Sequence, residues 1–133
     1  MKKDLVYKLL EMMLLEENTE KPVSVEVEAK PSVDPLVGKP VIVRSRDSGV
    51  HFGYLEYNEG RTVQLKNSRR MWRWWAAKQM TLSAVAEFGL NHDKDLRIQN
   101  TLSTIRILDA CEIIPCSEEA VKSIQSVEPY DEQ

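Results

Sequence analysis

The sequence has few of the residues that build metal sites, disulfide frameworks or membrane spans. Two of its 133 residues are cysteine and two are histidine, and no apolar run approaches the roughly 18 residues that cross a bilayer. Cys111 and Cys116 lie five positions apart in a stretch that reads as extended. Side chains at this spacing point to opposite faces of a strand, so we expect two free thiols and no disulfide between them. No second cysteine pair or close histidine pair completes a metal site, and we expect neither metal nor cofactor.

Motifs for catalysis and for export are also missing. The chain contains no Gly-rich phosphate loop, nucleophile elbow or HExxH pattern, and His51 and His92 each stand alone. We therefore expect a protein that is not an enzyme. The N-terminal lysines lead into a pattern that contains acids instead of a signal-peptide core, which predicts an intracellular protein outside the membrane.

The net charge of −3 is distributed unevenly along the chain. Residues 39–80 carry nine basic and three acidic side chains, a net charge of +6, whereas residues 81–133 carry four basic and ten acidic side chains, a net charge of −6. The basic middle segment predicts either a surface that binds a polyanion or a face that pairs with the acidic segment in the fold.

The first 38 residues differ in composition from the rest. Residues 3–16 place apolar side chains at steps of three and four, which predicts an amphipathic helix over residues 1–17. This helix either packs on its own domain, binds a partner or pairs copies of the chain through Leu5, Leu9, Met12 and Met13. Residues 18–38 are rich in Pro, Glu and Val and predict a linker, within which Val23, Val25 and Val27 alternate as in a short edge strand.

Residues 39–127 predict one compact α+β domain. Beta-rich runs at 40–44, 50–57 and 61–66 are separated by the turn signals Ser48-Gly49 and Asn58-Glu59-Gly60, which predicts a three-stranded antiparallel meander. We expect residues 68–77 to continue as a strand, residues 104–115 to complete the sheet, and short helices to follow caps at Thr81 or Ser83 and at Ser117. The expected architecture is a small barrel-like or rolled, SH3-like antiparallel sheet with short helices, followed by a disordered tail over 128–133.

An arginine- and tryptophan-rich segment, residues 66–75, is the main candidate for binding. Arginine pairs with phosphate oxygens while an indole stacks on a base, but the same two residue types also anchor protein interfaces. Alternatively, the tryptophans supply the core and the arginines point to water. The candidate contact residues are Arg44, Arg46, Lys66, Asn67, Arg69, Arg70, Trp72, Arg73 and Trp75.

Two runs and a closing strand carry a family resemblance. The runs are VIVRSRDSGVHFGYLE at 41–56 and VQLKNSRRMWRW at 63–74, and the closing segment is EIIPC at 112–116. Together they resemble a small domain encoded by tailed phages and prophages, over about residues 39–127. The resemblance implies an accessory protein of the bacterial cytoplasm that acts by occupying a host or phage protein, an anti-defence role being one candidate. Direct binding of nucleic acid or a nucleotide signal by the same surface, and a minor virion or assembly role, are the alternatives.

Overall fold

The computed structural model describes residues 34–130 as six strands and two short helices. The predicted helix of residues 1–17, with Leu5, Leu9, Met12 and Met13, and most of the predicted linker lie outside the described residues. The described part confirms the predicted α+β class. Its elements are β2 (Pro40–Ser45), β3 (Gly49–Glu59), β4 (Thr62–Arg73), α1 (Leu82–Phe88), β5 (Arg97–Ile98), β6 (Leu102–Ile107), β7 (Ala110–Pro115) and α2 (Glu118–Gln125).

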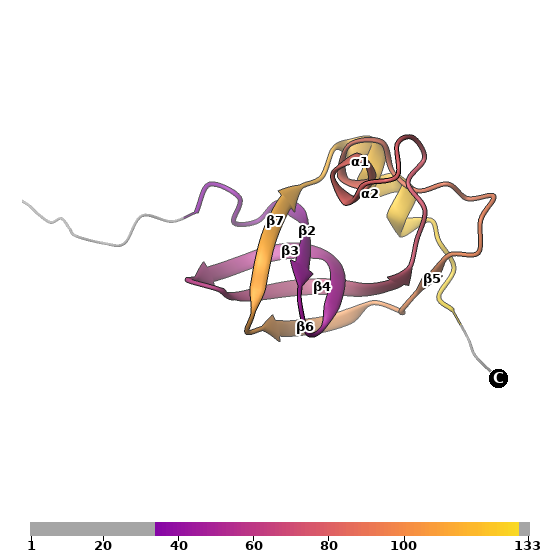
Figure 1. Cartoon of the computed structure of the whole chain (residues 1–133). Helices are drawn as coiled ribbons and strands as arrows, with labels where there is room; N and C mark the ends of the chain where they lie inside the picture. The colour runs from indigo at the N-terminus through magenta and orange to yellow at the C-terminus, as the bar shows by residue number, and fades with distance from the viewer. Residues whose placement is uncertain (1–33, 131–133) are drawn as a thin grey trace, which may run out of the picture. The chain divides into compact units, whose positions relative to one another are not determined.

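Strands β2, β3 and β4 form the predicted antiparallel meander (Figure 1). The turn between β3 and β4 lies where the sequence predicted it, and Gly60 adopts a φ of 59° there. β4 extends beyond the predicted run 61–66 but ends at Arg73, four residues before the expected end at Ala77. A register shift against β3 and a φ of 50° at Asn67 mark a bulge halfway along β4.

The consecutive strands β6 and β7 lie at opposite edges of the sheet. β6 is antiparallel to β4 and β7 is antiparallel to β2, so the ladders give β6 and β7 the same sense along the sheet order, although the two strands meet at a steep angle in Figure 1. Leu108 and Asp109 therefore form a kink between them, visible as a corner in Figure 1, instead of a hairpin turn. No ladder joins β6 to β7 within residues 34–130, and the sheet is not closed. The barrel-like expectation is thus corrected to an open sheet.

Two features of β7 explain why no further strand pairs with its outer side. Its register against β2 shifts next to Arg44, and its last residue, Pro115, has no N–H to donate. Both features remove regular hydrogen-bonding positions from the outer side of β7. The sheet order consequently ends at β7 on one side and at β5 and β6, which both pair with β4, on the other.

The sheet buries side chains on both faces. Val41, Ile42 and Val43 of β2 are all fully buried although neighbouring strand residues point to opposite faces. One core lies under α1 and α2, and the other lies between β2, β3, β4 and the β6–β7 path. The helix-side core includes Ile42, Phe52, Met71, Val85, Ile98 and Ile124, and the second core includes Val41, Val43, Leu55, Val63, Leu65 and Ile107.

Both helices begin at residues that the sequence predicted as caps. The Thr81 side chain accepts a hydrogen bond from the backbone N–H of Ala84, and the Ser117 side chain accepts one from that of Ala120. α1 ends at Gly89, as predicted, with a φ of 89°. Among the described residues, no helix is long and apolar enough to cross a membrane.

Replacement of Gly89 by alanine is expected to destabilise the domain strongly. A Cβ at this position would lie 2.6 Å from Ser123 Cβ, in addition to the strain of the positive φ. We expect Gly89→Ala to lower the free energy of unfolding by about 3 kcal/mol or more. Gly38 also has a positive φ but meets no atom within 4 Å, so Gly38→Ala should cost only about 1 kcal/mol. Equal losses in urea denaturation would show that the contact with Ser123 is not limiting.

Candidate binding surface

The second half of β4 separates two adjacent arginines into different environments. Beyond the bulge at Asn67, Arg69 and Met71 are buried whereas Arg70 and Trp72 are exposed. Arg69 lies opposite Phe52 of the helix-side core, and Arg70 lies opposite His51. Strand alternation therefore gives the two guanidinium groups different functions.

Arg69 is a structural residue, and its expected place on the contact surface is wrong. Its side chain is only 3% exposed, and it donates three hydrogen bonds to backbone carbonyls. Nε bonds Gln99 O at 2.9 Å, and the two terminal nitrogens bond Ile124 O and Val127 O, each at 2.8 Å. Burial lowers the pKa of Arg69, and the charge of Glu128 acts against this shift. The guanidinium thus fastens the end of α2 to β4, where a cation also complements the helix dipole.

Trp72 is the exposed tryptophan of the segment, and its ring is held from one side. Half of the residue is exposed, and its ring meets that of Tyr130 edge to face with centroids 5.6 Å apart. Tyr130 is fixed in turn, because its N–H donates to Ile98 O at 2.9 Å and the Arg97 guanidinium lies 4.7 Å from its ring centroid. The expected disordered tail began at Glu128, but the structure describes the chain through Tyr130.

An acidic side chain joins the remaining arginines of this region. Asp95 Oδ2 lies 3.0 Å from Arg97 and 3.6 Å from Arg73, and the Arg73 guanidinium lies 5.5 Å from the Trp75 ring centroid. Trp74 instead packs against the helix-side core. We call the group around the end of β4 the Trp72 surface. It comprises the exposed residues Arg70, Trp72, Arg73 and Asp95 and the partly buried residues Trp75, Arg97 and Tyr130.

Arg70 differs from the other arginines of the Trp72 surface because it makes no ion pair within residues 34–130. Its neighbour on β3, His51, is fully buried, and His51 Nε2 lies 3.2 Å from Ser48 Oγ while Nδ1 has no hydrogen-bond partner among the described residues. Burial, followed by the charge of Arg70, lowers the pKa of His51 to about 4. His51 is therefore neutral near pH 7.

The turn that leads into His51 is fastened to the β6–β7 kink. Asp109 accepts a hydrogen bond from Ser45 Oγ at 2.5 Å and one from the Asp47 N–H at 3.0 Å. The bond from Ser45 is the main cause of a lowered pKa of Asp109. The serine and histidine of this region thus contribute to a structural network, which the sequence, read residue by residue, did not indicate.

The other predicted contact residues lie away from Trp72. Arg44 pairs with Glu112 at 3.0 Å, and Arg46 is exposed in the turn after β2. Lys66 and Asn67 are exposed at the bulge of β4, five to six residues before Trp72, and line a shallow pocket of about 370 Å³. The predicted set therefore divides into separate places on the domain.

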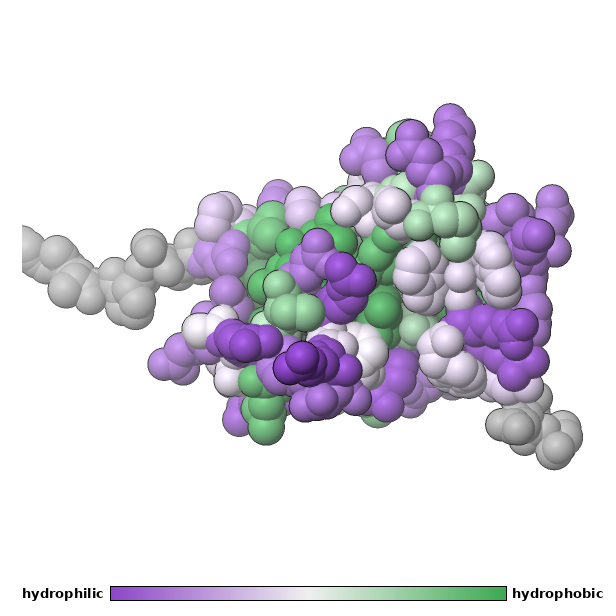
Figure 2. All heavy atoms as spheres, in the orientation of Figure 1, coloured by the Kyte–Doolittle hydropathy of each residue, from purple (hydrophilic) through white to green (hydrophobic). Residues whose placement is uncertain are grey.

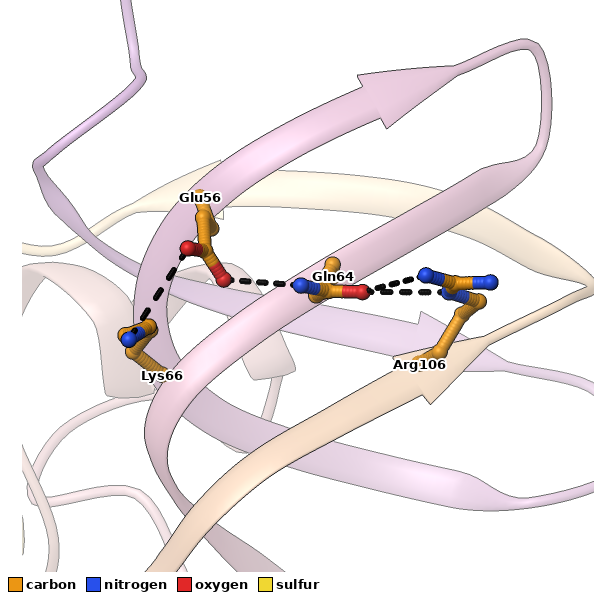
Figure 3. A network of polar contacts seen from close by, with 4 residues as sticks. All are labelled: Glu56, Gln64, Lys66 and Arg106. Atoms are coloured by element: carbon orange, nitrogen blue, oxygen red, sulfur yellow. Dashed lines mark hydrogen bonds and ion pairs between the residues drawn. The ribbon is translucent and has the colours of Figure 1, made fainter.

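The pocket at the bulge adjoins a polar network on neighbouring strands (Figure 3). Glu56 Oε1 accepts a hydrogen bond from Gln64 at 2.8 Å, and its other oxygen lies 3.9 Å from Lys66 Nζ. Gln64 Oε1 accepts two hydrogen bonds from Arg106, at 3.0 and 2.9 Å. Glu56 thus offsets the charge of Lys66, whereas Arg106 keeps its positive charge because its partner Gln64 is neutral.

The thiols and acids of the described residues form no metal centre: no group of three or more His, Cys, Asp and Glu residues comes together there. Cys111 is exposed and Cys116 is partly buried, and both are free thiols. Burial raises the pKa of Cys116 to about 12, which keeps it protonated.

A family model described as a domain of unknown function (DUF6948) matches residues 38–124. The chain belongs to this family. The match includes the whole of β4, whereas Tyr130 follows it. Searches of curated proteins and of solved structures gave no match.

The two adjacent arginines provide a direct test of the surface assignment. We expect Arg69→Met to lower the free energy of unfolding by roughly 3 kcal/mol or more, because three backbone carbonyls lose a charged donor. Arg70→Met, one residue away, should change stability by less than about 0.5 kcal/mol, because Arg70 is exposed and unpaired among the described residues. Urea denaturation of both variants measures the difference, and comparable losses would refute the assignment.

His51 predicts a loss of stability on mild acidification. Its pKa is about 4 in the folded chain and about 6.5 when unfolded, so its contribution is complete above pH 6.5 and is lost as the pH falls toward 4. The total loss is roughly 3 kcal/mol. Thermal unfolding between pH 7 and 4.5 should depend less on pH in His51→Gln than in the wild type. His92→Gln, which removes the exposed histidine, is the control and should retain the wild-type slope.

Proposed function

We propose that this protein is a phage-encoded accessory protein of the bacterial cytoplasm that binds a protein partner through the Trp72 surface. It acts by occupying that partner, which is a host or phage protein, and not by catalysis. The phage assignment rests on the resemblance of the runs at 41–56 and 63–74, and the mode of action rests on the side chains around the end of β4.

The observation that carries the proposal is the combination of exposure and order at Trp72. The residue is half exposed, yet Tyr130 meets its ring edge to face and is itself held by Ile98 and Arg97. A large ring that is already ordered loses little conformational freedom on binding, and tryptophan and arginine are the most frequent hot-spot residues of protein interfaces. Arg70 adds a positive charge without an ion pair in the described residues.

The charges around Trp72 favour a protein partner over a nucleic acid. Arg73 and Arg97 share Asp95, whose carboxylate would repel a phosphate group. Arg44, on β2, is likewise paired with Glu112. A surface of mixed charge around an exposed indole resembles the rim and centre of a protein interface, whereas phosphate recognition needs unpaired basic groups.

A nucleotide is the second candidate ligand, at the pocket beside the bulge. The pocket is lined by Tyr54, Lys66 and Asn67, which offer a ring, an ammonium group and an amide. Glu56 also lines it and lies 3.9 Å from Lys66, which reduces the attraction for phosphate. This candidate predicts dependence on Lys66 and not on Trp72.

An affinity isolation from bacterial lysate tests the proposal. A tagged full-length chain should retain a protein partner after nuclease treatment, and Trp72→Ala should weaken this binding about tenfold or more, because a central anchor contributes at least 1.4 kcal/mol. Met80→Ala is the matched control, since Met80 is an exposed apolar residue outside the Trp72 surface.

Two results would contradict the proposal. Retention that nuclease abolishes would identify a nucleic acid as the ligand. Binding that survives Trp72→Ala but is lost in Lys66→Ala would move the site to the pocket at the bulge.

A further inference from the structure

The outer edge of β6 is open within the described residues. β6 pairs with β4 in one unbroken register, from Leu102 opposite Ser68 to Ile107 opposite Val63. On the other side, no described residue makes a backbone hydrogen bond to residues 102–107. Free N–H and C=O groups along such an edge can pair with another strand.

β6 has none of the features that block edge pairing at β7. It contains no proline, and its register against β4 is regular. Its single charged residue, Arg106, turns across the sheet: it donates two hydrogen bonds to Gln64 Oε1, and its guanidinium lies 5.8 Å from the Tyr57 ring centroid (Figure 3). Arg106 is therefore held over the face of the sheet and does not cover the backbone groups of the edge.

Exposed leucines lie at both ends of this edge. Leu102 is 39% exposed at the start of β6, and Leu108 is 70% exposed directly after its end. Figure 2 shows apolar surface protruding beside the corner where β6 leads into β7. Large apolar side chains at both ends of an unprotected strand favour its burial by another chain.

We propose that β6 pairs antiparallel with β6 of a second copy of this chain, around a two-fold axis at Ile105. The sequence fits this register, because Leu102 and Leu108 each lie three residues from Ile105. Each leucine then lies across from the other leucine of the second copy, so both are covered at once. Arg106 lies across from Thr104, and no like charges face each other.

The size of the contact sets the strength of the dimer. One ladder over the five residues 103–107, flanked at its ends by the two leucine pairs, buries much less than the roughly 1,200–2,000 Å² of a stable interface. The pairing is therefore reversible and becomes populated as the concentration rises. A dimer of this kind carries two Trp72 surfaces, but the pairing does not depend on what those surfaces bind.

Sedimentation of the full chain from about 10 µM to about 1 mM, with amide hydrogen exchange at the same concentrations, tests the proposal. We expect the dimer fraction to rise with concentration and the exchange of β6 amides to slow in parallel. Leu108→Ser should weaken dimerisation about tenfold, whereas Met80→Ser, at another exposed apolar residue away from β6, should leave it unchanged.

A charge pair at Thr104 sharpens the test. Thr104 is exposed, and in the proposed register it faces Arg106 of the second copy. Thr104→Lys should weaken the dimer about tenfold, and Thr104→Glu should strengthen it several-fold. Thermal unfolding of both variants verifies that the domain remains folded.

Three outcomes would overturn the proposal. The first is a chain that stays monomeric at every concentration. The second is a dimer whose β6 amides exchange as fast as in the monomer, which would place the contact elsewhere in the chain. The third is protection of β6 that does not change with concentration, which would mean that the edge is covered within one chain.

Discussion

The three hydrogen bonds of Arg69 join β4 to the residue after β5 and to the end of α2, and no strand ladder reaches α2. β4 belongs to the sheet, Gln99 follows β5, and Ile124 and Val127 lie at the end of α2. Without this guanidinium the carbonyls at the end of α2 would lose their donor in a buried place. Arg69 therefore fixes the end of α2 and the chain that follows it, in addition to the packing of Ile124 in the helix-side core.

The exposed Trp72 surface also depends on Arg69. After Val127 the chain reaches Tyr130, whose N–H bonds Ile98 O and whose ring supports Trp72. Arg69 and Trp72 are three residues apart on the same strand, so β4 fixes both the anchor of the C-terminal segment and the ring that this segment supports. Lysine cannot replace Arg69 in this arrangement, because one ammonium group does not present donors in the three directions that the planar fork covers.

The parts of the fold that the sequence predicted are those set by neighbouring residues. The hairpin at Gly60 and the helix starts at Thr81 and Ser117 follow from turn and cap chemistry, and they are confirmed. The burial of Arg69 depends on the bulge at Asn67, which shifts the alternation of β4, and on carbonyls 30 to 58 residues away. Neither cause is visible in the run Ser68-Arg69-Arg70, where the two arginines look equivalent. Tyr130 was missed for a similar reason, since its partners come from β4 and β5.

Ion pairs within the fold offset part of the uneven charge distribution along the sequence. Arg44 of the basic segment pairs with Glu112 of the acidic one, and Arg73 pairs with Asp95, so intramolecular pairing accounts for part of the excess. Arg69 is used internally, which leaves Arg70 as the exposed, unpaired cation beside Trp72 in the described chain. A polyanion would gain little from one free arginine next to a carboxylate, whereas a protein partner can fill the indole's exposed side and offer one acid to Arg70. Because these ion pairs engage Arg44 and Arg73, the groups left to bind a partner are Arg70 and the exposed side of Trp72 at the end of β4.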